Sequence, residues 1–253
     1  MRLAHISWKK AEKYFENNDT VIIATGSIES HGTHIALGTD TLIPDKILDM
    51  IEDDLDVMIA PTVPYGACDS LKEFPGTISL SEEGLYMIMK KIVGSLVNHG
   101  AKKFVFLNGH GGNISTLNKI CLELDSINCL GTIVNWWLLA GELNPEWKGG
   151  HGGAEETSGV MAVNPDFVDF DAIEPMALKN VSDSLQQIAF STVDFKGIKM
   201  SIPRNIKTFT NNGWIGPDHP SNASLDWGVE MLKVTSKFIV EYINEFKKIE
   251  LDK

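Results

Sequence analysis

The sequence has few cysteines, few basic residues for its acidic content and no long apolar run. Its three cysteines, Cys68, Cys121 and Cys129, are odd in number and lack the spacing of a zinc site. No segment approaches the roughly 20 apolar residues of a membrane span. The first residues also lack the apolar run and cleavage site of a signal peptide. We therefore expect a cytoplasmic protein with reduced thiols and no membrane partner.

The excess of acidic over basic residues limits the kinds of molecule that the protein can bind. Lys and Arg number 22 against 34 Asp and Glu, which gives a formal net charge of −12. Such a charge excludes nucleic acid and anionic membranes as natural partners, because both repel an acidic surface. It leaves a small-molecule substrate open, since the local field in a site can oppose the global one.

Apolar runs with the character of buried strands alternate with amphipathic segments of helical period. We predict strands at 21–24, 57–60, 103–108 and 131–135, and helices at 8–17, 41–54, 81–98, 114–125 and 221–247. This alternation predicts an α/β fold with three layers, α/β/α, around a mostly parallel central sheet. The 253 residues contain no internal repeat or linker, so we expect one domain over 1–253.

The segment that follows the first predicted strand, GSIESHGTHIALGTD, contains Glu29, His31, His34 and Asp40. Carboxylate and imidazole together suit zinc, manganese or ferrous iron. Open α/β sheets place their sites at the carboxyl ends of strands, where this segment lies. An alternative assigns Asp40 only to capping the helix that follows.

Two further glycine-rich segments carry similar side chains. NGHGGN places His110 between a predicted strand and a helix, and GGHGGAEETS contains His151, Glu155 and Glu156 at a predicted helix start. Adjacent helical side chains point about 100° apart, so we expect only one of the two glutamates to face inward. Both glutamates could instead only favour the helix N-terminus. The coincidence of three glycine-rich clusters with acidic and imidazole side chains favours a catalytic metal site.

These three motifs together resemble those of the creatininase (creatinine amidohydrolase) family. The segments FPGTISL and WIGPDHPSNASLDWG extend the resemblance over nearly the whole chain. The resemblance implies a single α/β/α domain, a two-metal site often filled by zinc or manganese, and frequently a hexamer. It also implies hydrolysis of C–N bonds in cyclic amides or formamides.

Carried over by motif, the resemblance implies that Glu29 and His110 bind one metal, His31 binds the other and Asp40 bridges them. Creatininase has a glutamate ligand at the position of Gly112. Either Glu156 completes the second site, which we expect, or the second metal is bound weakly.

The catalytic histidine implied by the resemblance is His151, which matches a family histidine that acts on the substrate or the leaving group. We assign Glu156 to catalysis as well. Gly150 replaces the glutamate that precedes this histidine in creatininase, so creatinine itself is not the expected substrate.

Two divalent ions about 3.5–4 Å apart can share a water and lower its pKa towards 7. We therefore expect the resulting hydroxide to attack the carbonyl of an amide in a small polar molecule. His151, with an ordinary pKa near 6.5, would give a proton to the leaving amine.

Candidate substrate-binding residues are Trp136, Asn113 and His34. Trp136 and its neighbour Trp137 could stack on a planar ring, and a position in the core or in a subunit interface is an equal alternative. Lys72 and Arg204 are the only basic residues in suitable loops, so we expect an unphosphorylated polar ring or polyol derivative.

Two other functions stay open at this point. The same metals could serve a hydrolase that opens a cyclic ketone or a sugar-derived ring. The fold could also serve a non-catalytic protein that binds a metal or a ligand, although all five expected ligands are present.

Overall fold

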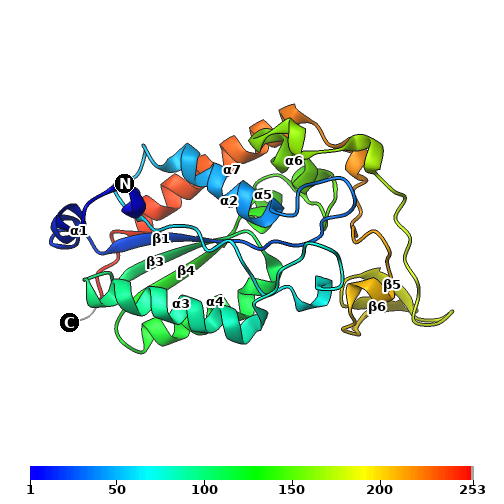
Figure 1. Cartoon of the computed structure of the whole chain (residues 1–253), viewed down its shortest axis with the longest axis horizontal. Helices are drawn as coiled ribbons and strands as arrows, with labels where there is room; N and C mark the ends of the chain where they lie inside the picture. The colour runs from blue at the N-terminus through cyan, green and yellow to red at the C-terminus, as the bar shows by residue number, and fades with distance from the viewer. Residues whose placement is uncertain (252–253) are drawn as a thin grey trace.

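The computed structural model describes residues 1–251 and contains a four-stranded parallel sheet between two layers of helices (Figure 1). The strand order is β2 (Met58–Ile59), β1 (Thr20–Thr25), β3 (Lys103–Asn108) and β4 (Leu130–Asn135). Thr25 pairs with Asn108 and Asn108 pairs with Asn135, so β1, β3 and β4 end at the same level. The expected three-layer α/β/α class is confirmed.

Side chains of the central strands alternate between two cores because successive residues of a strand point to opposite faces. Ile22 and Ala24 pack on one face and Val21 and Ile23 on the other. The first face is covered by α2 (Thr39–Ile51), α5 (Trp136–Leu143), α6 (Ala154–Val163) and α7 (Leu225–Phe246). The second is covered by α1 (Trp8–Phe15), α3 (Ser81–Asn98) and α4 (Ile114–Asp125). Figure 1 shows α2 and α7 above the sheet and α3 and α4 below it.

Two helix starts differ from the prediction. Helix α2 begins at Thr39 after Gly38, so Asp40 lies within the first turn and does not cap the helix. Helix α7 begins at Leu225, because residues 220–222 form a separate 3-10 turn. The Ser224 hydroxyl then accepts a hydrogen bond from the Trp227 N–H at 3.2 Å, which caps α7.

A second sheet follows α6 and was not predicted. Strands β5 (Gln186–Ala189), β6 (Thr192–Phe195) and β7 (Ile198–Ser201) form an antiparallel meander at the right end of the molecule in Figure 1. The turn between β5 and β6 places Phe190 and Ser191 near the loops that follow β1 and β3 of the main sheet. Within residues 1–251, no helix has the length and apolarity needed to cross a membrane.

The topology fixes where a site can form. From β1 the chain passes to β2 on one side, and β3 pairs with β1 on the other side. This reversal is a topological switch point, and ligands of open α/β sheets bind at the carboxyl ends of the strands beside it. The loops that leave β1 and β3 there carry the polar clusters of the sequence.

Candidate metal centre

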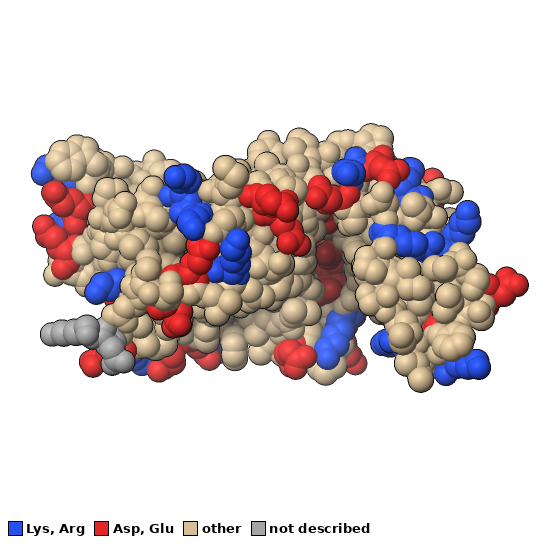
Figure 2. Space-filling view, turned by 90° about the horizontal axis from the view of Figure 1, so that it is seen from below, with Lys and Arg blue, Asp and Glu red and all other residues tan. Residues whose placement is uncertain are grey.

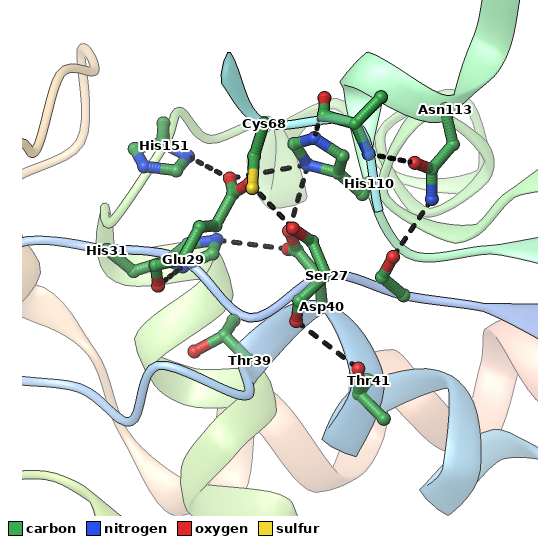
Figure 3. Close-up of polar contacts among 12 residues, drawn as sticks. Ser27, Glu29, His31, Thr39, Asp40, Thr41, Cys68, His110, Asn113 and His151 are labelled. Atoms are coloured by element: carbon green, nitrogen blue, oxygen red, sulfur yellow. Dashed lines mark hydrogen bonds and ion pairs between the residues drawn. The ribbon is translucent and has the colours of Figure 1, made fainter. Parts of the chain in front are cut away.

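Four segments bring the predicted ligands together, and Figure 3 labels the four ligands of the first three segments, Glu29, His31, Asp40 and His110. The loop after β1 supplies Glu29 and His31, and the first turn of α2 supplies Asp40. The loop after β3 supplies His110, and α6 supplies Glu156 from its first turn. All but Glu156 are buried, and only 13% of the Glu156 side chain is exposed.

These side chains form two triads that share one carboxylate. Ligand atoms of Glu29, Asp40 and His110 lie within 4.8 Å of one another, and so do those of His31, Asp40 and Glu156. Asp40 directs one oxygen to each triad: its Oδ1 is 3.0 Å from His31 Nε2, and its Oδ2 is 2.9 Å from His110 Nδ1. A carboxylate placed in this way can bridge two cations.

Each histidine in the cluster has one ring nitrogen held by a backbone carbonyl. His110 Nε2 donates to Ala67 O at 3.0 Å, and His31 Nδ1 donates to Glu29 O at 3.1 Å. His151 Nε2 donates to Ser30 O at 2.6 Å. The second nitrogen of each ring therefore faces the carboxylates, which is how proteins orient imidazole ligands of metals.

The charge balance of the cluster fits cations. Burial would lower the pKa of His31, but the carboxylates of Asp40 and Glu156 outweigh it and raise the pKa to about 10. Burial would also lower the pKa of His110, but the carboxylates of Glu29 and Asp40 outweigh it and raise this pKa well above the ordinary value. Burial of Asp40 is in turn outweighed by the two imidazoles, which lower its pKa. Protons thus balance buried negative charge that a divalent ion would balance instead.

Two buried oxygens, Glu29 Oε1 and Asp40 Oδ2, lie 3.3 and 2.9 Å from His110 Nδ1 and have no further hydrogen-bond partner among the described residues. A neutral His110 that keeps its proton on Nε2 donates to neither oxygen, and buried carboxylate oxygens without donors are costly unless a cation satisfies them. Together with the mixed oxygen and nitrogen donor set, they fit a divalent metal such as zinc or manganese.

The backbone around the cluster explains why Gly112 carries no ligand. A Cβ at this position would lie 2.1 Å from Ala67 O and 2.5 Å from His110 Nε2, so a side chain would break the hydrogen bond between them. Gly150 is equally confined, because its Cβ would lie 2.5 Å from Gly216 Cα. Neither position has room for the glutamate that the family resemblance implies there, and Glu156 belongs to the second triad.

A pocket of about 430 Å³ opens over the two triads. Its floor holds four of the five candidate ligands, Glu29, Asp40, His110 and Glu156, together with His151. Its walls include Trp137 of α5 and Phe190 of the β5–β6 turn. The Phe190 ring lies 4.6 Å from the His151 ring, measured between centroids. Figure 2 shows the surface hollowed between the main body and the part that carries the small sheet.

His151 stands on the edge of the cluster. Its ring stacks on His31 with 4.2 Å between centroids, and its Nδ1 is 3.9 Å from Glu29 Oε1. With those two residues it forms a third group that could hold an ion. Burial and the charge of His31 lower its pKa well below the ordinary value, so the imidazole is neutral.

Both glutamates of α6 face the pocket, which corrects the expectation that only one would. Glu156 contacts His31 at 3.7 Å, and Glu155 lines the pocket wall. Burial, with the charges of Glu156 and Asp218, raises the pKa of Glu155 to about 9. For Glu156, burial and Asp40 outweigh His31 and raise the pKa to about 7. The lining includes Gly149 and Gly150, which precede the helix, as well as both glutamates, so side chains 100° apart both reach the pocket.

The three predicted substrate-binding residues do not line this pocket. Trp136, the first residue of α5, is buried in the core, and Trp137 lines the pocket where Trp136 was expected. Asn113 braces the backbone, donating to Gly26 O at 3.0 Å and accepting from Ala67 N at 3.1 Å. His34 Nε2 contacts the Thr157 hydroxyl at 3.0 Å behind the cluster.

Sequence reasoning missed Phe190 as a residue of the pocket wall, and of the tryptophan pair that it named it assigned Trp136 rather than Trp137 to substrate binding. The doublet at 136–137 indicated an aromatic wall, and only the helix start at Trp136 decides which ring faces it. Nothing in the sequence around Phe190 marked it, because it lies in a turn between two unpredicted strands.

Comparisons with known proteins agree with this geometry. The family model Creatininase, described as creatinine amidohydrolase, matches residues 4–243. Creatinine amidohydrolase of Pseudomonas putida is 28% identical over 194 residues, which are 68% of this chain and 75% of that protein. A mycofactocin precursor peptide peptidase of Mycolicibacterium smegmatis is 30% identical over 159 residues, covering 60% of this chain and 61% of the peptidase. The 3-dehydro-scyllo-inosose hydrolase of Thermotoga maritima is 22% identical over 175 residues, covering 64% and 56%.

Solved structures share the fold over the whole length. A manganese creatininase superimposes with a TM-score of 0.77 at 23% identity, covering 98% of this chain and 99% of that one. A Zn–Zn form of a mutant creatininase gives a TM-score of 0.76 at 23% identity, with 98% of both chains covered. The family model spans almost the entire sequence, and its members are hydrolases. The chain therefore belongs to the creatininase (creatinine amidohydrolase) family.

Proposed function

We propose that this protein hydrolyses a C–N bond in a cyclic amide or formamide of a small polar molecule, using two divalent metal ions. The observation that carries the proposal is the position of Asp40, whose two oxygens face the two triads at the floor of the pocket. Glu29 and His110 would hold one ion, and His31 and Glu156 the other. Such a pair of ions supplies an activated water and a Lewis acid for the carbonyl oxygen.

His151 is the residue proposed to move the proton. Its Nε2 is committed to Ser30 O, so only Nδ1 is free to exchange a proton with groups in the pocket. Nδ1 faces Glu29 Oε1 across 3.9 Å, at the side of the cluster where a bound amide would lie. The neutral imidazole would accept a proton from the attacking water and pass it to the leaving nitrogen.

Phe190 and His31 both contact this imidazole. Their ring centroids lie 4.6 and 4.2 Å from that of His151, and these contacts restrict the orientation of the ring. A general base whose orientation is restricted keeps its lone pair directed at the reacting atoms, and this orientation raises the rate of proton transfer.

The test combines metal analysis with turnover of a lactam and amide panel. We expect wild type to bind close to two metals per chain, and Asp40→Asn to lose at least half of that content. His151→Gln should keep its metals and lose kcat by roughly 10²- to 10⁴-fold, the usual contribution of general acid–base catalysis. His99→Gln, exposed at the end of α3, is the control and should match wild type. Full kcat in His151→Gln would refute its role, and metal-free wild type after reconstitution would refute the centre.

A second candidate is hydrolysis of a cyclic ketone or sugar-derived ring. The similarity to an inosose hydrolase favours it, because that relative is named for a substrate without an amide. Cyclic polyol ketones added to the same panel separate the two candidates. Turnover of such ketones with none of the amides would favour the second.

A further inference from the structure

Residues 214–218, the start of the segment WIGPDHPSNASLDWG, lie against the loop that precedes α6. They belong neither to the pocket nor to any of the three candidate metal groups. The Ile215 N–H donates to His151 O at 2.8 Å. A Cβ on Gly150 would lie 2.6 Å from Ile215 O, so the two backbones are in direct contact. A segment that supplies no side chain to the centre thus packs directly on the motif that carries His151 and Glu156.

Helix α6 begins without a side chain of its own that could cap it, because its N-cap residue is Gly153. The first N–H groups of an α-helix have no partner within the helix, and a Ser, Thr, Asp or Asn at the N-cap usually accepts one of them. In α6 the acceptor comes from 63 residues further along the chain: the Glu155 N–H donates to Asp218 Oδ2 at 3.0 Å. Asp218 therefore provides the cap that Gly153 cannot.

The space around the Asp218 carboxylate exists because its neighbours are glycines. A Cβ on Gly153 would lie 2.4 Å from Asp218 Oδ1, and a Cβ on Gly216 would lie 2.7 Å from the same oxygen. A Cβ on Gly149 would lie 2.6 Å from Oδ2. A side chain at any of these three positions would displace the carboxylate, so the glycines of two separate motifs are needed to seat it.

The cap matters to the candidate metal centre because Glu156 belongs to the same turn of α6. Glu156 Oε2 accepts a hydrogen bond from the Gly152 N–H at 2.7 Å and lies 3.7 Å from His31 Nε2. The other members of that triad, His31 and Asp40, precede α3 in the chain, and the first triad takes no ligand from α6. A shift of this turn would therefore change the second triad and spare the first.

Building on the proposed function, we propose that Asp218 is a positioning residue of the second metal site. It caps α6 from outside the helix and so fixes the turn from which Glu156 reaches the ion. Partners that orient a metal ligand typically change metal affinity by about 10- to 100-fold. Removal of the Asp218 carboxylate should thus weaken the ion held by His31 and Glu156 without affecting the ion held by Glu29 and His110.

The first test titrates zinc into metal-free protein by calorimetry, with elemental analysis of the product. We expect two binding events in wild type, and Asp218→Ala should weaken one of them by roughly 10- to 100-fold and leave the other unchanged. Ser224→Ala is the matched control, because it removes the corresponding cap of α7. It should lower the unfolding temperature and retain both ions. Wild-type affinity for both ions in folded Asp218→Ala, or loss of an ion from Ser224→Ala, would overturn the proposal.

The second test moves the cap onto the helix itself. Gly153 has φ −84° and ψ −170°, an extended conformation that a serine N-cap adopts without strain. Gly153→Ser alone should weaken the second ion, because its Cβ meets the Asp218 carboxylate. Combined with Asp218→Ala, the same serine has space and can accept an N–H of the first turn. We expect the double variant to bind the second ion more tightly than either single variant does.

Additive losses in this double-mutant cycle would contradict the role of Asp218, since no cap would then have been restored. Should Asp218→Ala fail to fold, the double variant decides the question. It should fold and bind both ions, and its failure to do so would overturn the proposal.

Hydrogen exchange of metal-free protein gives a readout that does not depend on the proposed function. The amides of residues 154–157 should exchange faster in Asp218→Ala and return towards the wild-type rate in the double variant. Ser224→Ala should leave them unchanged. Unaltered exchange in Asp218→Ala would refute the cap, whereas a wild type that binds no zinc would refute the metal centre of the proposed function. The two failures are therefore distinguishable.

Discussion

His34 is the imidazole of the first motif that the metal triads leave out. Its Nε2 donates to the Thr157 hydroxyl, whose own proton goes to Gly153 O at 2.7 Å. Its Nδ1 is buried and has no hydrogen-bond partner within residues 1–251. Burial, aided by His31 and His219, lowers the pKa of His34 to about 4. The folded protein therefore holds this ring neutral at a pH where the unfolded chain protonates it.

Because of this pKa difference, the free energy of unfolding depends on pH between about 6.5 and 4. Above pH 6.5 the ring is neutral in both states and has no effect. As the pH falls from 6.5 towards 4, the unfolded state gains a proton that the folded state does not, and stability falls by up to about 3 kcal/mol. We expect urea unfolding of metal-free protein to show this loss in wild type and its absence in His34→Gln.

The test of the role of His34 is how the difference in unfolding free energy between wild type and His34→Gln changes with pH. The His34→Gln substitution can shift stability at every pH, so only the change between pH 6.5 and 4 counts. His5→Gln, at an exposed position, should follow wild type throughout. A difference that stays constant across the window would contradict the assignment.

At the scale of elements, the start of α2 lies directly against the ends of β1 and β3. A Cβ on Gly109 would lie 1.9 Å from Asp40 O and 2.7 Å from Pro44 Cγ. A Cβ on Gly26 would meet Thr41 in the same way, at 2.2 Å from its Oγ1. These glycines let the helix carry Asp40 into the cluster.

Gly109→Ala should therefore lose both stability and metal. We expect the free energy of unfolding to fall by about 2 kcal/mol or more, because the methyl group meets backbone atoms that cannot yield locally. Gly111→Ala is the matched control two residues away, since a Cβ there meets nothing within 4 Å. It should change stability by no more than about 0.5 kcal/mol. Equal effects of the two substitutions, measured by urea unfolding and elemental analysis, would refute this account of the packing.

The elements that sequence predicted well are those with a clear period. The observed bounds match the prediction for helices 81–98 and 114–125 and for strand 103–108. Each of these elements is bounded in the sequence by residues that clearly mark a turn. Helix α5 was missed because its sequence, WWLLAGEL, is apolar on nearly every side and shows no helical face. Strands β5 to β7 are four residues each and largely exposed, so they carry little pattern.

The candidate site was likewise predictable only where the sequence carries a recognisable pattern. Glu29, His31, Asp40, His110 and Glu156 were predicted because their motifs carry the chemistry in the sequence itself, and the structure brings them together. Which side chains line the pocket depends on where a helix starts and how the wall curves. That Trp137 and Glu155 both line the pocket therefore became visible only in three dimensions.

At the scale of the whole molecule, the free edge of the main sheet carries an apolar surface. Strand β4 is the last strand on its side, and a groove of about 270 Å³ runs between it, α5 and α7. Leu138, Phe238 and Tyr242 line this groove and are 53%, 41% and 37% exposed. Clustered exposed apolar side chains of this kind mark surfaces that associate.

We therefore expect the homo-oligomer implied by the family resemblance to form through this groove. Sedimentation should give wild type a mass that is a multiple of 27.9 kDa, sixfold for a hexamer. Phe238→Glu places a charge in the groove and should lower that mass, because burying an unpaired carboxylate opposes association. Leu122→Glu serves as the control: it is 72% exposed on α4, in the opposite helical layer, and should leave the mass unchanged. Retention of the full mass by Phe238→Glu would place the interface elsewhere, whereas a monomeric wild type would contradict the oligomer itself.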